Sequence, residues 1–253
     1  MTLGSHLSPL ARSHIEQADV VFAAMSDGIV EKWIAGMNKD VRSLQPHYTE
    51  GKSRLQSYRG MVDAMLAEVR TGKKVVGAFY GHPGVFVWPS HKAIEIARSE
   101  GFQAHMEPGI SAEDCLYSDL GIDPGRYGCQ HYEASQLLLY ARRIDPSAYL
   151  ILWQVGVVGD QSLTKLGTTA AYRQVLVDRL ARDYPRQHEV ILYRGATLPI
   201  ERPQVRRLPL HALAATEVTQ EHTLVIPPAQ RLQPDRDTRA RLSVLDVLEK
   251  AGR

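Results

Sequence analysis

The chain contains little cysteine and no excess of either charge. Its 253 residues include only two cysteines, Cys115 and Cys129, outside any metal-ligand spacing, so the sequence offers neither a disulfide framework nor a cysteine-based metal site. We interpret both as small, buried, reduced side chains. The 30 basic and 28 acidic residues nearly cancel, which argues against binding to nucleic acid or to an anionic membrane through a strong electrostatic field.

Long apolar runs are also missing. No stretch reaches the length of a transmembrane helix, and the N-terminal residues lack the basic and apolar regions of a signal peptide. We therefore expect a cytoplasmic protein. With 44% hydrophobic residues, the chain can bury the core of one large domain or of two small, closely packed ones.

Helical and strand-like segments alternate in the first half of the chain. Residues 7–22 are typical of a helix leading into a strand, with Ser8 as the N-cap and Pro9 at the first helical position. We expect further helices at 29–37, 51–69 and 89–100, another beginning at 109–111, and strands at 74–80 and 103–106. This alternation, up to about Ala134, predicts an α/β fold with a parallel sheet covered by helices.

The second half has a different rhythm. It contains expected strands at 148–155, 189–193, 206–208 and 223–226 and a helix at 170–183, which predicts a mixed, more antiparallel second sheet. We divide the chain into an N-terminal α/β lobe, a C-terminal α/β lobe, and a charged tail that is helical from Thr238 to Lys250. The corresponding ranges are 1–134, 135–228 and 229–253.

A glycine-rich turn follows the apolar strand at 74–80. This strand is short and lies between Gly72 and Gly81, as expected of a strand covered on both faces. Pro83 and Gly84 continue the turn, and glycine lets the backbone approach a ligand closely. Because open α/β sheets bind small ligands at the carboxyl ends of their strands, this turn predicts a cofactor cleft.

Four ordered motifs resemble one family. They are YGHPGVFV at 80–87, GISAEDC at 109–115, DLGIDP at 119–124 and GATLP at 195–199. Together they are similar to the borosin peptide backbone α-N-methyltransferases, which belong to the tetrapyrrole-methylase (class III) superfamily of S-adenosylmethionine enzymes. The resemblance runs from about Leu7 to Pro228. It implies a two-lobed fold, S-adenosylmethionine as cofactor, and S-adenosylhomocysteine as its product.

The resemblance also implies a first strand that is missing from this sequence. The superfamily normally opens with a strand and a glycine-rich loop before a helix start, and LSPLA at 7–11 occupies the place of that helix start. Losing a central parallel strand would leave the backbone of its neighbours unpaired. We therefore favour a start codon assigned inside the gene over a chain that dispenses with the strand.

Tyr48, Arg54 and Tyr58 supply the residue types that amide methylation needs. An amide nitrogen is a poor nucleophile because its lone pair is delocalised into the carbonyl. Its methylation calls for a base, a hydrogen-bonding or cationic clamp for the oxygen, and a dry pocket. Arg54 and Tyr58 are four residues apart and share a helix face, and a guanidinium beside a phenol favours the phenolate.

The spacing of these residues matches the catalytic Tyr-Arg-Tyr set of the borosin enzymes. On that resemblance we assign Tyr48 as the base, Arg54 as its electrostatic partner and amide-oxygen clamp, and Tyr58 as a second hydrogen bonder. Tyr80 matches a further family tyrosine near the methyl donor. The alternative is structural, since a helical Arg–Tyr pair is usually a solvated face with one ring packed inward.

The resemblance further implies a set of cofactor-binding residues. Ser111 and backbone amides are expected to bind the methionine carboxylate, and Val85, Phe86 and Leu198 to enclose the adenine or ribose; ordinary core packing is the alternative for those three. No metal site is predicted, because the remaining histidines are scattered singly. The full set is Tyr80, His82, Val85, Phe86, Ser111, Ala112, Gln154, Ala196 and Leu198.

Several borosin enzymes methylate a C-terminal extension of their own chain. Residues after Pro228 are charged and contain no core rich in valine, isoleucine and glycine. We therefore expect the split form, which acts iteratively on a separate precursor peptide, as a homodimer in a two-plus-two complex. Two alternatives stay open: a methyltransferase for a corrinoid or siroheme precursor, which would not need the Tyr-Arg-Tyr set, and a non-catalytic peptide-binding relic.

Overall fold

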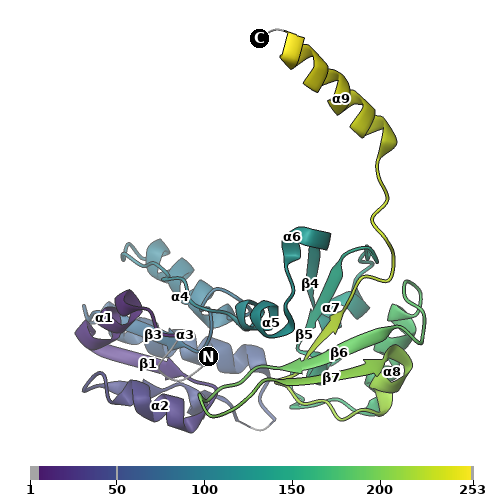
Figure 1. Ribbon diagram of the computed structural model, residues 1–253. Helices are drawn as coiled ribbons and strands as arrows, with labels where there is room; N and C mark the ends of the chain where they lie inside the picture. Colours follow the sequence, from purple (N-terminus) through teal and green to yellow (C-terminus); the bar gives the residue numbers. More distant parts are fainter. Residues whose placement is uncertain (1–5, 50, 252–253) are drawn as a thin grey trace.

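The strands of the protein form two separate sheets (Figure 1). The computed structural model describes residues 6–49 and 51–251. In sheet A the order is β2-β1-β3 and all strands are parallel. In sheet B the order is β4-β5-β8-β6-β7, where β4 and β5 are parallel and the other pairs antiparallel. The expected α/β fold, with a parallel first sheet and a mixed second sheet, is confirmed.

The elements around sheet A are α1 (Pro9–Gln17), β1 (Val20–Ala24), α2 (Gly28–Ala35), β2 (Val41–Ser43), η1 (Gln45–His47), α3 (Arg54–Arg70), β3 (Val75–Phe79), α4 (Trp88–Ser99) and α5 (Ala112–Leu120). Those around sheet B are α6 (Pro124–Tyr127), β4 (Cys129–Glu133), α7 (Ala134–Leu139), β5 (Tyr149–Trp153), η2 (Val155–Val157), α8 (Ala170–Leu180), β6 (Glu189–Arg194), β7 (Gln204–Pro209), η3 (Leu210–Ala215) and β8 (Thr223–Ile226). The last helix, α9 (Arg236–Ala251), extends away from both sheets (Figure 1).

Local sequence determines where the helices of sheet A begin. Ser8 caps α1 by accepting a hydrogen bond from the N–H of Ala11, and Pro9 follows it, as predicted. Ser53 and Gln56 form a reciprocal capping box at α3. This helix therefore begins at Arg54, three residues later than the sequence reading placed it. All five residues of β1 are buried, because β1 is the central strand of sheet A.

The outer edge of β3 has no ladder partner among the described residues. A cavity of about 480 Å³ lies along this edge and is lined by β3, by residues 102–109 and by α1, α3 and α4. The strand expected at 103–106 is not formed, since this segment belongs to neither sheet. The expectation that β3 is covered on both faces is also wrong, since Val75 and Val76 are half-buried and Gly77 is exposed.

Sheet B carries the larger core. Its strands pack against α7, α8 and η3 through buried side chains that include Leu152, Leu176 and Leu224. The sequence missed β4, whose residues are mostly polar, although β4 pairs along its whole length with β5. No helix in the described part of the chain is long and apolar enough to cross a membrane.

Two buried tyrosines in the second half of the chain, Tyr184 and Tyr193, are expected to differ in how loss of the hydroxyl group changes the stability of the protein. The Tyr184 hydroxyl is buried without a hydrogen-bond partner among the described residues, whereas that of Tyr193 donates to Asp119 at 2.7 Å. Because an unpaired buried polar group is destabilising, Tyr184→Phe should be neutral or stabilise the protein by about 1 kcal/mol, and Tyr193→Phe should destabilise it by about 1.5 kcal/mol. Urea unfolding measures both, and a clear destabilisation by Tyr184→Phe would show that its hydroxyl is satisfied in solution.

Candidate active site

Three tyrosines from separate elements lie close together. Tyr48 follows η1, Tyr58 lies on α3, and Tyr80 follows β3. The rings of Tyr48 and Tyr58 meet edge to face with centroids 6.2 Å apart, and both Tyr58 and Tyr80 are near enough to Tyr48 to raise its pKa. The tertiary fold therefore brings together the phenols that the sequence singled out.

Arg54 ties the start of α3 to the loop that follows η2. Its backbone N–H donates to the carbonyl oxygen of Leu163 at 2.8 Å, and its guanidinium lies 3.4 Å from a carboxylate oxygen of Asp160. The Asp160 side chain is fully buried. The guanidinium of Arg54 thus pairs with the carboxylate of Asp160, a residue that the sequence analysis did not identify.

Asp160 is ionised despite its burial. Burial alone would raise the pKa of its carboxyl, but hydrogen bonds from Ser162 and Lys165, together with the charge of Arg54, lower the pKa below its ordinary value. Both Ser162 donors reach one oxygen, at 2.6 and 3.0 Å, while the N–H of Lys165 reaches the other at 3.0 Å. The buried negative charge is therefore well satisfied and fixes the guanidinium.

Tyr48 keeps its proton at neutral pH in this arrangement. Burial raises the pKa of its phenol well above the ordinary value, and the neighbouring Tyr58 and Tyr80 raise it further. Arg54 lowers the pKa, as expected from the sequence, but its effect is smaller than the opposing ones. Without a further positive charge nearby, Tyr48 is a hydrogen-bond donor rather than a base.

Two glycine-containing loops pack directly against each other beside the tyrosines. A Cβ on Gly109 would lie 2.5 Å from the carbonyl oxygen of Gly81 and 3.1 Å from the Cα of His82, so only glycine fits at this contact. Nδ1 of His82 accepts a hydrogen bond from the N–H of Gly84 at 2.9 Å. The loop after β3 is thereby placed next to the loop that leads into α5.

The hydroxyl of Ser111 is used inside the protein. Ser111 is buried and caps α5: its Oγ accepts hydrogen bonds from the N–H groups of Glu113 and Asp114 and donates to the Asp114 carboxylate at 2.8 Å. A carboxylate ligand contacting this hydroxyl would have to replace part of the cap. Ala112, the first residue of α5, is exposed.

Phe86 connects the loop after β3 to the end of β5. Its ring is half exposed and contacts that of Trp153, with centroids 5.8 Å apart. Phe86 and Gln154 both have φ of +57°, a left-handed conformation that is strained for side chains other than glycine. Such strain is concentrated at functional sites, and the Phe86–Trp153 contact joins the two sheets here.

The remaining candidates lie around the same junction. Val85 is half-buried and donates its N–H to the carbonyl oxygen of His82 at 3.1 Å. Ala196 and Leu198 lie in the loop between β6 and β7, and Leu198 packs against the apolar cluster around β1 and α2. This loop therefore reaches from sheet B to the core of sheet A.

Besides Asp160, the sequence analysis missed two residues, Trp88 and His131, whose rings stack on aromatic side chains at this site. Trp88, at the start of α4, stacks on Tyr58 with centroids 6.3 Å apart. His131 stacks on Trp153 at 6.0 Å and accepts a hydrogen bond from its indole N–H at 3.2 Å. Trp88 directly follows the YGHPGVFV motif, a signal that could have identified it, whereas the His131 contact depends on the pairing of β4 with β5.

Comparison with curated proteins finds relatives whose names combine a methyltransferase with a cyclic-peptide precursor. A methyltransferase/ribosomally synthesized cyclic peptide gymnopeptides precursor of Gymnopus fusipes is 44% identical over 245 residues, covering 95% of this chain and 58% of the relative. The corresponding omphalotin A precursor of Omphalotus olearius is 43% identical over 239 residues, covering 93% of this chain and 57% of the relative. The chain thus spans somewhat more than half the length of these relatives.

Solved structures and a family profile agree on the fold. Uroporphyrin-III-C-methyltransferase from Thermus thermophilus superposes with a TM-score of 0.63 at 19% identity, over 90% of both chains. Cobalt precorrin-4 methyltransferase superposes with a TM-score of 0.59 at 15% identity, over 87% of this chain and 88% of the other. The profile of the Tetrapyrrole (Corrin/Porphyrin) Methylases matches residues 3–214. The chain therefore belongs to the Tetrapyrrole (Corrin/Porphyrin) Methylases.

Proposed function

We propose that this protein is an S-adenosylmethionine-dependent methyltransferase that methylates backbone amide nitrogens of a peptide. The observation that carries the proposal is the cluster of Tyr48, Tyr58 and Tyr80 beside Arg54, at the carboxyl end of β3. The cyclic-peptide precursors named in the relatives of Gymnopus and Omphalotus support a peptide substrate. The fold alone would suit many acceptors.

The cluster supplies what an amide acceptor requires. Removing the amide proton leaves negative charge on the carbonyl oxygen, which needs donors or a cation close by. Arg54, fixed by the buried Asp160, offers a positive charge, and the hydroxyl of Tyr58 offers a hydrogen bond. Tyr48 can accept this proton only as a phenolate, after its own proton has been released to solvent. Because burial raises the pKa of this phenol, the phenolate forms only when a second positive charge lies beside it.

The loops around the tyrosines have the chemistry to hold S-adenosylmethionine. Tyr80 and Phe86 are 53% and 50% exposed, and such aromatic surface suits a purine ring. The side-chain amide of Gln154 offers both a hydrogen-bond donor and an acceptor for the edge of the purine ring. The other residues proposed to line the cofactor site are His82, Val85, Ser111, Ala112, Ala196 and Leu198. When bound, the compound supplies a methyl group on a positively charged sulfur.

The substrate is proposed to be a separate precursor peptide, methylated several times by a homodimer in a two-plus-two complex. The names of the relatives join a methyltransferase and a precursor. Here residues 229–251 contain many charged side chains, and in α9 leucines and valines alternate with them on an exposed helix. That composition is unlike a tract of small apolar residues, so residues 229–251 themselves are not the proposed acceptor.

Calorimetry tests the cofactor part of the proposal. The protein should bind S-adenosylmethionine and S-adenosylhomocysteine at one site per chain. Phe86→Ala should weaken both by about tenfold or more, since losing the burial of a phenylalanine ring costs about 1.5–3 kcal/mol. Tyr140→Ala, which removes an exposed ring at the end of α7, is the matched control. Absence of binding heat for either compound at high protein concentration would refute a cofactor site.

A further inference from the structure

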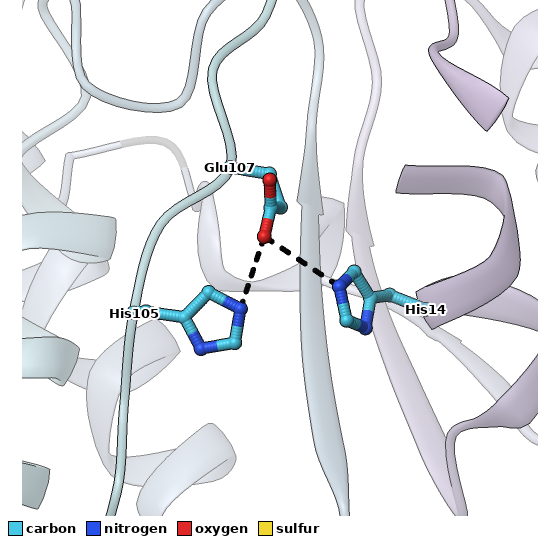
Figure 2. Close-up of side chains that lie close together, drawn as sticks. All are labelled: His14, His105 and Glu107. Atoms are coloured by element: carbon cyan, nitrogen blue, oxygen red, sulfur yellow. Dashed lines mark ion pairs between the residues drawn. The ribbon is translucent and has the colours of Figure 1, made fainter. Parts of the chain in front are cut away.

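A cluster of three possible metal ligands lies outside the proposed active site. His14 comes from the last turn of α1, while His105 and Glu107 come from the extended segment before α5. Figure 2 shows the Glu107 carboxylate pointing between the two imidazole rings, which approach it from different elements. One ligand atom from each residue lies within 4.8 Å of the other two.

The spacing of these atoms suits a divalent cation. One oxygen of Glu107 lies 3.1 Å from Nε2 of His105 and 3.5 Å from Nε2 of His14. In a tetrahedral zinc site with bonds of about 2.0–2.1 Å, neighbouring ligand atoms are about 3.4 Å apart. Two imidazoles and one carboxylate are also a ligand set that zinc accepts, with a fourth position left for water.

The two imidazoles also lie next to each other. Their rings meet edge to face with centroids 5.5 Å apart. A single cation placed among the two imidazoles and the carboxylate would use all three groups as ligands.

The position of the cluster gives a bound ion a structural role. All three residues line the cavity beside the open edge of β3, and the segment at 102–110 forms no ladder. Glu107 is two residues before Gly109, which packs against Gly81 in the loop after β3. An ion at this point would connect α1 to the segment that enters α5.

We propose that His14, His105 and Glu107 bind one zinc-like divalent cation, which fastens residues 102–110 to α1. The sequence analysis predicted no metal site, because His14 and His105 are far apart along the chain. The proposal is independent of the methyl-transfer chemistry, since none of the three residues belongs to the proposed cofactor or catalytic set.

Metal titration of the chelator-treated protein tests this proposal. Zn²⁺ followed by calorimetry, and Co²⁺ followed by visible absorption, should both saturate at one ion per chain at mildly alkaline pH, where protons compete less for imidazole. His14→Ala, His105→Ala and Glu107→Gln should each weaken Zn²⁺ binding by at least about tenfold. His211→Ala, which removes an exposed histidine of η3, should bind as the parent does.

A second measurement reports on the segment itself. Zn²⁺ should slow amide hydrogen exchange across residues 102–110 in the parent protein and in His211→Ala, but not in Glu107→Gln, whose side chain keeps the size of glutamate. Weak binding of several ions per chain, or equal affinity in the parent and the three variants, would overturn the proposal. So would exchange in this segment that is the same with and without the metal.

Discussion

Tyr58→Phe and Arg54→Ala are expected to lower methylation turnover by about two to four orders of magnitude while leaving cofactor and peptide affinities nearly unchanged. Both side chains are proposed to act on charge that develops on the amide only during the reaction, so their loss should affect kcat far more than binding. Tyr58→Phe keeps the ring that stacks on Trp88. Single-turnover rates and calorimetry on the same samples separate the two effects.

Arg54→Ala needs a structural control, because it leaves the buried Asp160 without its cationic partner. Such an unpaired carboxylate destabilises a protein. The double variant Arg54→Ala/Asp160→Asn removes the buried charge and should recover part of the folding stability but not turnover, because the amide oxygen keeps the bonds from Ser162 while the amide nitrogen cannot accept the one from Lys165. Arg59→Ala, which removes an exposed arginine from the same helix, should keep the folding stability and the turnover of the parent protein. Near-normal turnover in Tyr58→Phe or in Arg54→Ala would show that the substituted residue has a purely structural role.

Features that depend on neighbouring residues could be predicted from the sequence. The cap at Ser8, the proline after it, and the strands β1 and β3 follow from local preferences and hydrophobic spacing, whereas the short strand β2 was not predicted. The start of α3 was predicted three residues early, because the reciprocal capping by Ser53 and Gln56 determines where the helix begins. The polar strand β4 was missed because its stability comes from pairing with β5.

Contacts between distant residues could not be predicted in this way. The pairing of Arg54 with Asp160 joins residues 106 positions apart, and the contact of Phe86 with Trp153 depends on how the two sheets meet. The segment at 103–106 has the composition of a strand, yet a strand also needs a hydrogen-bonding neighbour. The same physical reason governs the pKa of Tyr48: the predicted effect of Arg54 is present, but burial by residues from other elements outweighs it.

Several methyl groups are expected on backbone nitrogens of a separate peptide that is co-expressed with this protein. The proposed chemistry acts on the amide, a group that every residue except proline repeats, and is therefore indifferent to most side chains. An enzyme of this kind can advance along a bound peptide and repeat the reaction. Intact mass of a co-expressed candidate precursor peptide should show successive additions of one methyl mass, and tandem mass spectrometry should place them on backbone amides near its C-terminus.

The same spectra distinguish transfer to another chain from self-methylation. Residues after Pro228 of this protein should remain unmodified, because the described part of that region, through α9, contains many charged and few small apolar side chains. Co-expression with Tyr58→Phe is the matched control: the peptide should accumulate at similar levels but carry few or no methyl groups. Methylation of side chains only, or of this protein's own residues 229–253, would contradict the proposed acceptor. An equally methylated peptide with the Tyr58→Phe enzyme would instead contradict the proposed role of the tyrosine cluster, since its phenol would then contribute nothing to the transition state.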